Sequence, residues 1–358
     1  MTAAVALDAL YEIYEKIRAG GLERADARLL VTQPGPLFAI ADALRRAEKG
    51  EVVTYLVNRN INFTNICVGT CKFCAFREGS ERGFLMSMET VLQKVEEAVN
   101  RGATEICIQG GLHPYLVLES YCELLEMIKA HFKVHLHAFS PMEIYHVARN
   151  SRLSEEDVLR ALKQAGLGSI PGTAAEILDD AVRAIICPTK LSTAQWVEII
   201  KTAHRLGIPS TATILYGHLE SWEHRIDHLF TIRAIQEETG GFTEFVPLKF
   251  MGKNNELGRM VQREVQFLED AMLHALARVI LHPYCTNLQV SWVKLGLVAA
   301  QRMLEFGAND LGGTLMEESI SRLSGATAGE YLIPDEFERL IRAAGRIPKR
   351  RTTLYEIN

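Results

Sequence analysis

Three cysteines near the start of the chain are the residues most able to do chemistry. Cys67, Cys71 and Cys74 form the segment CVGTCKFC, with the spacing C-x3-C-x2-C. Chance rarely places three cysteines at this spacing, so the segment indicates a site for a metal or an iron–sulfur cluster. Each remaining cysteine is isolated and is expected to be a small buried hydrophobic residue: Cys107, Cys122, Cys187 and Cys285.

The number of thiols limits what this segment can hold. A structural zinc site needs four ligands, and the sequence has no second C-x2-C pair. A cluster that only passes electrons is usually held by four cysteines. Three thiolates on a 4Fe-4S cluster leave one iron open, as a catalytic zinc leaves one position for a reacting molecule. The segment favours such a catalytic cluster, and a cluster-binding electron carrier is the alternative.

An open iron needs a chelating ligand. The amino and carboxylate groups of S-adenosylmethionine (SAM) usually fill that position, so that an electron from the cluster can break the sulfonium C–S bond and yield a 5′-deoxyadenosyl radical. We therefore expect SAM as a second cofactor and an external electron donor.

Short β-rich runs alternate with helical patterns after residue 50, which predicts βα units and a parallel sheet. A helix is expected from near Ser87, and others over 118–131, 154–164 and 192–206. Strands are expected over 61–67, 104–109, 133–139, 166–170, 210–216, 242–248, 287–292 and 308–313. Eight strand–helix pairs predict an α/β fold, a (β/α)8 TIM-type barrel, with an open doubly wound sheet as the alternative. In the barrel, the cysteine loop would follow the first strand at the C-terminal mouth, where barrel active sites lie.

The expected organisation is one barrel with additions at both ends. Residues 1–50 are expected to form an N-terminal helical cap, 51–330 the barrel, and 331–358 a C-terminal extension packed on the barrel. The basic residues near the end, Lys349, Arg350 and Arg351, are expected to be solvated, and the alternative is that the helical cap and the C-terminal segment form lids over the barrel.

Composition narrows the kinds of partner. The chain has 358 residues, 48% of them hydrophobic, and a net charge of -5. That charge provides no basic face for nucleic acid, so a small-molecule substrate is favoured. The apolar runs are too short to cross a membrane, and the cysteines lack a disulfide framework. A cytoplasmic protein without a membrane partner is expected.

Polar residues follow the second and third expected strands, at the predicted mouth of the barrel. The second strand ends in QGGLHP, where Gly110 and Gly111 allow close approach of the backbone to a ligand, or form a tight turn with positive φ. His113 is expected to face the substrate, with a turn histidine bonded to backbone as the alternative. The third strand ends in HLHAFSP and leaves Ser140 at the rim.

Three later residues complete the set of candidates. Glu176 is expected to accept a hydrogen bond from a ribose hydroxyl, or to be a carboxylate at a helix start. His218 is a candidate acid–base group, with a polar loop residue as the alternative. Asp310 lies on the last strand and, if buried, needs a partner such as an amino-acid ammonium or a ring N–H.

Longer motifs around these residues resemble one branch of the radical SAM superfamily. That branch holds aminofutalosine synthase, dehypoxanthine futalosine cyclase and the deazaflavin synthases, and the resemblance runs from about residue 50 to the end. Two motifs, IPGTAAEILDD and LGGTLMEESISR, are most similar to the tyrosine-using subunit of deazaflavin (FO) synthase, and the chain lacks the triple glycine that often follows Ile-Pro in the futalosine cyclase. The other motifs are NRNINFTNIC, CKFCAFR, QGGLHP, HAFSP, YGH, ETGGFTEFVPL and NLQVSWVKLG.

The resemblance implies a reaction. The adenosyl radical takes a hydrogen from L-tyrosine, the Cα–Cβ bond breaks, and the 4-hydroxybenzyl fragment adds to 5-amino-6-(D-ribitylamino)uracil on the route to coenzyme F420. The product then passes to a second radical SAM subunit that closes the deazaflavin ring. The resemblance also implies that Phe73 occupies the aromatic position of the cysteine motif, whose backbone faces the adenine of SAM. It implies that Gly110 and Gly111 hold the methionyl amine of SAM. The alternative function is that of either futalosine enzyme in menaquinone biosynthesis.

Overall fold

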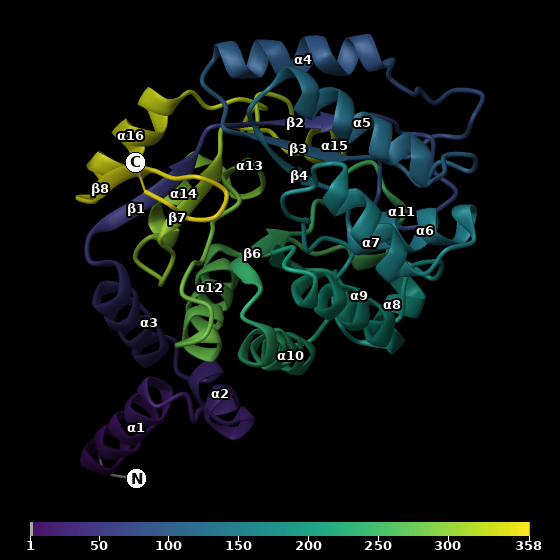
Figure 1. The fold of residues 1–358 in the computed structure, drawn as a ribbon. Coiled ribbons are helices and arrows are strands. Elements are labelled where there is room, and N and C mark those ends of the chain that lie inside the picture. The colour runs from purple at the N-terminus through teal and green to yellow at the C-terminus, as the bar shows by residue number, and fades with distance from the viewer. Residues whose placement is uncertain (1–2, 358) are drawn as a thin grey trace.

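Parallel strands form a barrel surrounded by helices in the computed structural model, which describes residues 3–357 (Figure 1). The strands are β1 Val52–Leu56, β2 Asn58–Asn62, β3 Glu105–Gln109, β4 His135–Ala138, β5 Ser210–Tyr216, β6 Phe242–Lys249, β7 Asp310–Gly313 and β8 Ile347–Arg350. The helices are α1 Ala3–Arg18, α2 Arg24–Val31, α3 Pro34–Lys49, α4 Met88–Asn100, α5 Leu118–His131, α6 Pro141–Ser151, α7 Glu155–Gln164, α8 Asp180–Ile186, α9 Thr193–Arg205, α10 Trp222–Thr239, α11 Glu256–Val261, α12 Phe267–Leu281, α13 Trp292–Leu295, α14 Leu297–Met303, α15 Ser319–Leu323 and α16 Pro334–Ala343.

The strand pairings close into a circuit, which confirms the barrel and is incompatible with an open sheet. β2 pairs with β3, β3 with β4, β5 with β6, and β7 with β1, all in parallel. Two strand positions of the barrel, at 169–170 and 288–289, are joined to their neighbours only by isolated β-bridges. Residues 169–170 pair through His137 to Ser169 and Ile170 to Ser210, and residues 288–289 pair through Phe245 to Leu288 and Gln289 to Asp310. The predicted strands 166–170 and 287–292 therefore exist only as short contacts in the circuit.

The first barrel strand begins earlier than predicted. β1 and β2 together cover most of 52–62, whereas the sequence pattern indicated 61–67. Asparagine is unfavourable in strands, so the segment NRNIN carries little strand signal. Its pairing with β3, in register from Asn58 opposite Glu105 to Asn62 opposite Gln109, overrides that preference. Cys67 consequently lies in the loop rather than at the end of a strand.

Helix α6 was not predicted and begins directly after β4. Ser140 is its N-cap: the Ser140 hydroxyl accepts a hydrogen bond from the Glu143 amide, and the Glu143 carboxylate accepts one from the Ser140 amide. This reciprocal capping box starts the helix at the rim of the barrel. By contrast, α5 and β5 have the predicted bounds.

The two ends of the chain pack against different parts of the barrel. Among the N-terminal helices, α3 packs against α12, and α2 packs against α10 and α12. The C-terminal strand β8 pairs in parallel with β1. Arg351, immediately after β8, is 2% exposed, so the expectation that it is solvated was wrong. Its guanidinium is buried because two buried carboxylates, Asp310 and Glu244, bind it.

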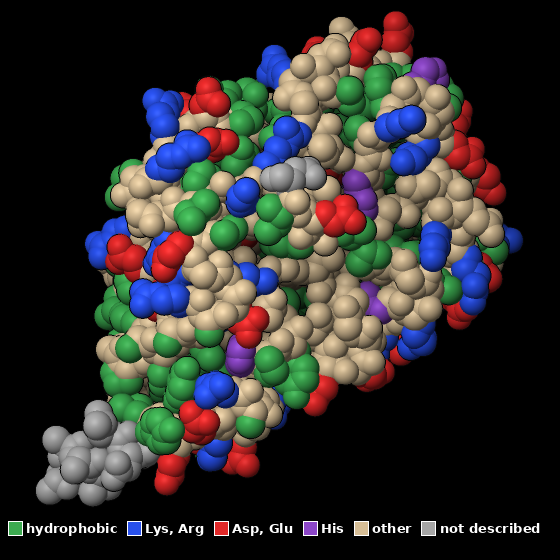
Figure 2. Space-filling model, turned by 60° about the vertical axis from the view of Figure 1, so that its left-hand side comes forward, with side chains coloured by type: hydrophobic (Ala, Val, Ile, Leu, Met, Phe, Trp, Pro, Cys, Tyr) green, Lys and Arg blue, Asp and Glu red, His purple; other side chains and the backbone are tan. Residues whose placement is uncertain are grey.

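The surface carries no separated regions of opposite charge on the face shown in Figure 2, where basic and acidic side chains are interspersed. Within residues 3–357, none of the helices combines the length and the apolar character needed to span a bilayer.

Candidate active site

The loop that carries the three cysteines is fixed by backbone hydrogen bonds to distant segments. The Cys67 amide donates to Glu78 O at 3.1 Å, and the Val68 amide donates to Leu112 O at 3.0 Å, which joins the loop to the segment after β3. The Lys72 amide donates to Ile186 O at 2.9 Å, at the end of α8. The loop is thus held between the segment after β3 and the end of α8.

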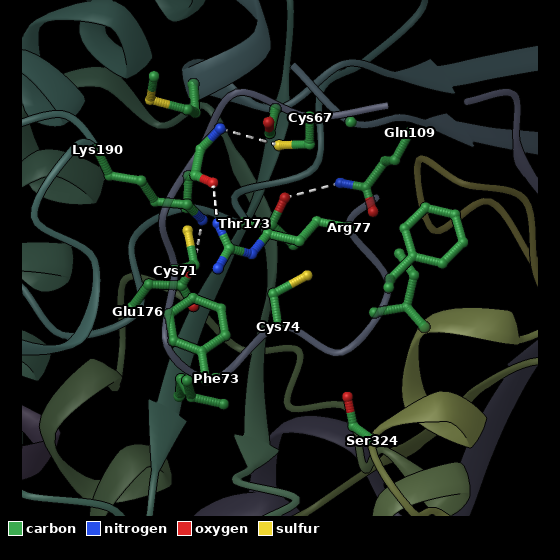
Figure 3. A pocket seen from close by; sticks show the side chains of 18 of the residues that line it. Cys67, Cys71, Phe73, Cys74, Arg77, Gln109, Thr173, Glu176, Lys190 and Ser324 are labelled. Atoms are coloured by element: carbon green, nitrogen blue, oxygen red, sulfur yellow. Dashed lines mark hydrogen bonds and ion pairs between the residues drawn. The ribbon is translucent and has the colours of Figure 1, made fainter. Parts of the chain in front are cut away.

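All the residues predicted to hold a cluster or SAM line one cavity of about 240 Å³, which we call the cysteine cavity (Figure 3). In Figure 3, Phe73, Glu176 and Lys190 are drawn on the Cys71 side of the cavity, and Gln109 on the opposite side. The predicted residues that line it are Cys67, Cys71, Phe73, Cys74, Gly110, Gly111, Ser140 and Glu176.

The cysteine side chains differ in their surroundings. Cys71 is buried, and burial raises the pKa of its thiol to about 12, against the opposing effect of the Lys190 ammonium. Cys67 and Cys74 are half-buried, and the Cys67 sulfur accepts a hydrogen bond from the Gly69 amide at 3.3 Å. Within residues 3–357, no three His, Cys, Asp or Glu side chains are arranged to hold a single metal ion.

The glycine pair after β3 packs directly against the cysteine loop. A Cβ atom on Gly111 would lie 2.4 Å from Ile66 O and 3.0 Å from Cys67 Cβ. A Cβ atom on Gly110 would lie 2.6 Å from the Phe63 ring. Neither residue is among the described glycines with positive φ. Close approach, rather than a left-handed turn, is therefore what requires glycine at both positions.

Glu143 is a residue of this cavity that the sequence analysis missed. Its carboxylate accepts hydrogen bonds from the Gly110 amide at 2.9 Å and from the Ser140 hydroxyl at 2.7 Å. Burial raises the pKa of Glu143 to about 7, although these hydrogen bonds act in the opposite direction. Glu143 thereby joins the start of α6 to the glycine pair. The S-x-x-E spacing of a capping box was the sequence signal that could have found it.

Glu176 forms an ion pair inside the cysteine cavity. Lys190 Nζ lies 2.5 Å from Glu176 Oε1 and 5.3 Å from the centre of the Phe73 ring. Burial opposes the charge on Lys190, but the Glu176 carboxylate and the nearby cysteines raise its pKa above the ordinary value. Lys190 was also missed, because nothing in the local sequence indicates that it faces Glu176.

The three predicted catalytic residues line neither this cavity nor the one inside the barrel. The His113 ring accepts a hydrogen bond from the Tyr115 amide at 3.2 Å, as a turn histidine does. The His218 ring is buried, bonded to the backbone at Leu215 O and the Leu219 amide. Asp310 is buried against Arg351. The structure therefore does not bring these three side chains to the cavities.

A second cavity, the barrel cavity, occupies about 270 Å³ inside the barrel. Side chains at alternate positions of the strands line it, as expected for the inner face of a barrel. Amide, hydroxyl and imidazole groups predominate among its polar members: Asn58, Asn60, Asn62, Gln109, His137, Thr173, Thr211, Thr213, Gln289, Ser291, Ser321 and Thr353. The three asparagines were not predicted as site residues, because the first strand was expected to begin at residue 61.

The C-terminal tail closes part of the barrel cavity. Arg351 and Thr353 both line it. The Thr353 hydroxyl donates to Glu105 Oε2 at 2.7 Å, and Arg351 Nη2 donates to Glu244 Oε2 at 3.1 Å. These buried bonds tie the last residues of the chain to β3 and β6.

The two cavities adjoin. Five residues line both of them: Gln109, Thr173, Leu248, Lys294 and Ile320. Gln109 Nε2 donates to Thr173 Oγ1 at 2.7 Å, which fixes two of these side chains at the junction. The geometry supports a cofactor in the cysteine cavity and a substrate deeper in the barrel.

Comparison with known proteins defines the class. The model of the radical SAM superfamily matches residues 61–232, and that of the CofH/MqnC C-terminal region matches residues 239–358. The fold is similar to the solved structure of the FeFe-hydrogenase maturase HydG from Carboxydothermus hydrogenoformans, with TM-score 0.74, 15% identity, and coverage of 98% of this chain and 82% of that one. It is also similar to methylornithine synthase (PylB), with TM-score 0.72, 16% identity, and coverage of 94% and 97%. The protein is a radical SAM enzyme.

Curated relatives define the particular family. A protein of Archaeoglobus fulgidus named 5-amino-6-(D-ribitylamino)uracil--L-tyrosine 4-hydroxyphenyl transferase is 57% identical over 329 residues, covering 92% of this chain and 95% of the relative. A protein of Methanosarcina acetivorans with the same name, numbered 1, is 53% identical over 350 residues, covering 96% and 93%. The chain belongs to this transferase family, which confirms the resemblance found in the sequence.

Proposed function

We propose that this chain joins the 4-hydroxybenzyl group of L-tyrosine to 5-amino-6-(D-ribitylamino)uracil. The names of its relatives support these substrates. The observation that carries the proposal is the junction of the cysteine cavity with the barrel cavity, because it allows cofactor and substrates to meet inside the barrel. Enclosure also keeps water and exposed C–H and S–H groups away from a radical.

The residues of the cysteine cavity fit a 4Fe-4S cluster. Cys67, Cys71 and Cys74 supply three soft thiol ligands, as such clusters require. A cluster offers a different iron to each thiolate, so the three thiols need only share a cavity, as they do here. When bound, the cluster and SAM supply a 5′-deoxyadenosyl radical, with the electron coming from an external donor. Because the free Cys71 thiol has a raised pKa, cluster binding must displace its proton.

The remaining cavity residues position SAM in this proposal. Gly110 and Gly111 present bare backbone to the methionyl amine, and the Phe73 backbone faces the adenine. Glu176 accepts a hydrogen bond from the ribose, with its orientation maintained by Lys190. Ser140 acts indirectly, because its hydroxyl is bonded to the Glu143 carboxylate that also binds the Gly110 amide.

The polar lining of the barrel cavity suits the uracil substrate. Amide side chains such as Asn60 and Asn62 can both donate and accept, as the edge of a uracil ring requires, and threonine hydroxyls can bond a ribityl chain. His137 stays neutral there, since burial lowers its pKa to about 4. We further propose that the joined product passes to a second radical SAM subunit that completes the deazaflavin, because this chain has a single C-x3-C-x2-C segment.

The test uses anaerobically reconstituted enzyme with dithionite and SAM. Incubation with tyrosine and the diaminouracil should release 5′-deoxyadenosine and give a joined product detectable by mass spectrometry. Turnover of a futalosine derivative, without the joined product, would assign the chain to the menaquinone enzymes instead. A cluster whose EPR spectrum does not respond to SAM would indicate an electron carrier.

A further inference from the structure

Four cationic side chains line the two cavities, and three of them already have partners. Arg77 Nη1 donates to Gly69 O at 2.6 Å. Lys190 is paired with Glu176, and Arg351 with Asp310 and Glu244. The fourth, Lys294, lines both cavities. Within residues 3–357, its ammonium group has no hydrogen-bond or ion-pair partner.

The position of Lys294 is set by a rigid neighbour. Lys294 belongs to the short helix α13, whose first residue, Trp292, is 2% exposed and donates from Nε1 to Gly313 O at 3.0 Å. The indole is therefore anchored to β7, and the lysine side chain follows at the junction of the cavities.

The two carboxylates whose charges act on Lys294, Glu318 and Glu176, are used by other groups. Glu318 accepts hydrogen bonds from Asn60 Nδ2 at 2.7 Å and from the Ser321 amide at 2.9 Å. Glu176 is bound to Lys190. Burial lowers the pKa of Lys294, and the fields of Glu318 and Glu176 only partly oppose this effect. A half-buried ammonium without a partner is costly, so the site is complementary to an added anion.

We propose that Lys294 binds the α-carboxylate of the amino-acid substrate at the junction of the two cavities. This inference rests on the proposed function, since tyrosine carries a carboxylate whereas the ribityl-diaminouracil has neither a carboxylate nor a phosphate. Binding at the junction places the amino acid beside the cofactor in the cysteine cavity and next to the second substrate in the barrel cavity. Lys294 is thus a substrate-binding residue that determines specificity for an amino acid over an amine.

The competing anion is the carboxylate of SAM itself, because Lys294 also lines the cysteine cavity. The two possibilities differ in which ligand loses affinity when the charge is removed. The contact between Lys294 and the substrate carboxylate can be measured with two ligands, tyrosine and tyramine, because tyramine is tyrosine without its carboxylate. The difference between the affinities for tyrosine and tyramine therefore reports the contribution of the carboxylate contact.

The experiment measures calorimetric binding of tyrosine and of tyramine to the reconstituted holoenzyme with SAM and without reductant. Wild type should prefer tyrosine about 10- to 100-fold, the range expected for one hydrogen-bonded charge pair. Lys294→Gln should reduce that preference to less than about threefold, and Lys294→Arg should restore part of it. The control is Lys133→Gln, an exposed lysine that lines neither cavity, which should keep the wild-type preference.

Two results overturn the inference. One is a Lys294→Gln enzyme that keeps the wild-type preference for tyrosine. The other is a Lys294→Gln enzyme whose affinity for SAM falls while the preference is retained, which assigns the lysine to the cofactor. If the wild-type enzyme forms the joined product, either result refutes the role of Lys294 and leaves the proposed function intact. A wild type that neither binds tyrosine nor forms the product refutes the proposed function as well.

Discussion

Replacing Gly111 by alanine should damage the cluster site more than the fold. The added Cβ would lie 2.4 Å from Ile66 O and 2.9 Å from Ile66 C, and both of these are backbone atoms of the cysteine loop. A side chain could rotate away from such an overlap, but backbone cannot. The loop or the strand end must therefore move, and Cys67 is the next residue along the loop.

The size of the displacement follows from ordinary contact distances. Carbon and oxygen approach closely only to about 3.3 Å, so the two segments must separate by roughly 1 Å. Overpacking of this kind costs about 1–3 kcal/mol of folding free energy. Ligand distances in a metal site tolerate only about 0.2 Å of change. We therefore expect Gly111→Ala to lower the free energy of unfolding modestly and to lower the amount of bound cluster sharply.

The assay compares iron and sulfide content after anaerobic reconstitution with the melting temperature of the same preparation. Gly111→Ala should bind less than about half the iron of wild type, with a melting temperature lower by roughly 2–5 °C. Gly79→Ala is the matched control, because it lies in the same loop and its Cβ would have no heavy atom within 4 Å. The reasoning fails if Gly111→Ala binds iron and SAM as well as the Gly79→Ala control does.

Three further predictions concern charge and burial. Arg351→Met leaves two buried carboxylates without a cation and should lower the free energy of unfolding, measured from urea midpoints, by about 3–5 kcal/mol. The control is Lys349→Met at an exposed lysine, which should change this free energy little. Equal urea midpoints for the two variants would contradict the burial argument. Burial lowers the pKa of His228 from 6.5 to about 3 in the folded protein. Between these two pH values the unfolded chain binds a proton at His228 and the folded protein does not, so the free energy of unfolding falls as the pH falls from 6.5 toward 3. His228→Asn should therefore reduce the pH dependence of stability between pH 6.5 and 4.5 by about 1.4 kcal/mol per pH unit, and parallel curves for wild type and variant would contradict it. Glu176→Gln removes the partner of Lys190 and should weaken SAM binding by about 10-fold in equilibrium dialysis, while unchanged affinity would argue against its proposed role at the ribose.

Local features of the sequence predicted the most about the structure. Alternating β-rich and helical runs predicted the barrel, because strand and helix periodicities can be read from consecutive residues. The spacing of the cysteines predicted a shared site, because a short loop keeps its own residues close together. The glycines after β3 and the glutamate at 176 line the same cavity as the cysteines, since the ends of parallel strands meet at one mouth.

The missed residues depend on contacts between distant parts of the chain. NRNIN carries little strand propensity, yet pairing with β3 makes it a strand and turns its asparagines into the barrel cavity. His218 looked like an acid–base group, but its ring is buried and satisfied by backbone. Asp310 needed a partner, as the sequence analysis argued, but that partner is Arg351 rather than a substrate.

The sequence by itself therefore determined the type of fold, the iron–sulfur chemistry and the family, since all three are contained in short motifs and their order. Only the tertiary structure decided which charges are paired. Arg351 is buried by residues far away in the chain, and Lys294 lies without a partner between two cavities. Electrostatic pairing depends on distances across the closed barrel, and the periodicity along a strand contains no information about those distances.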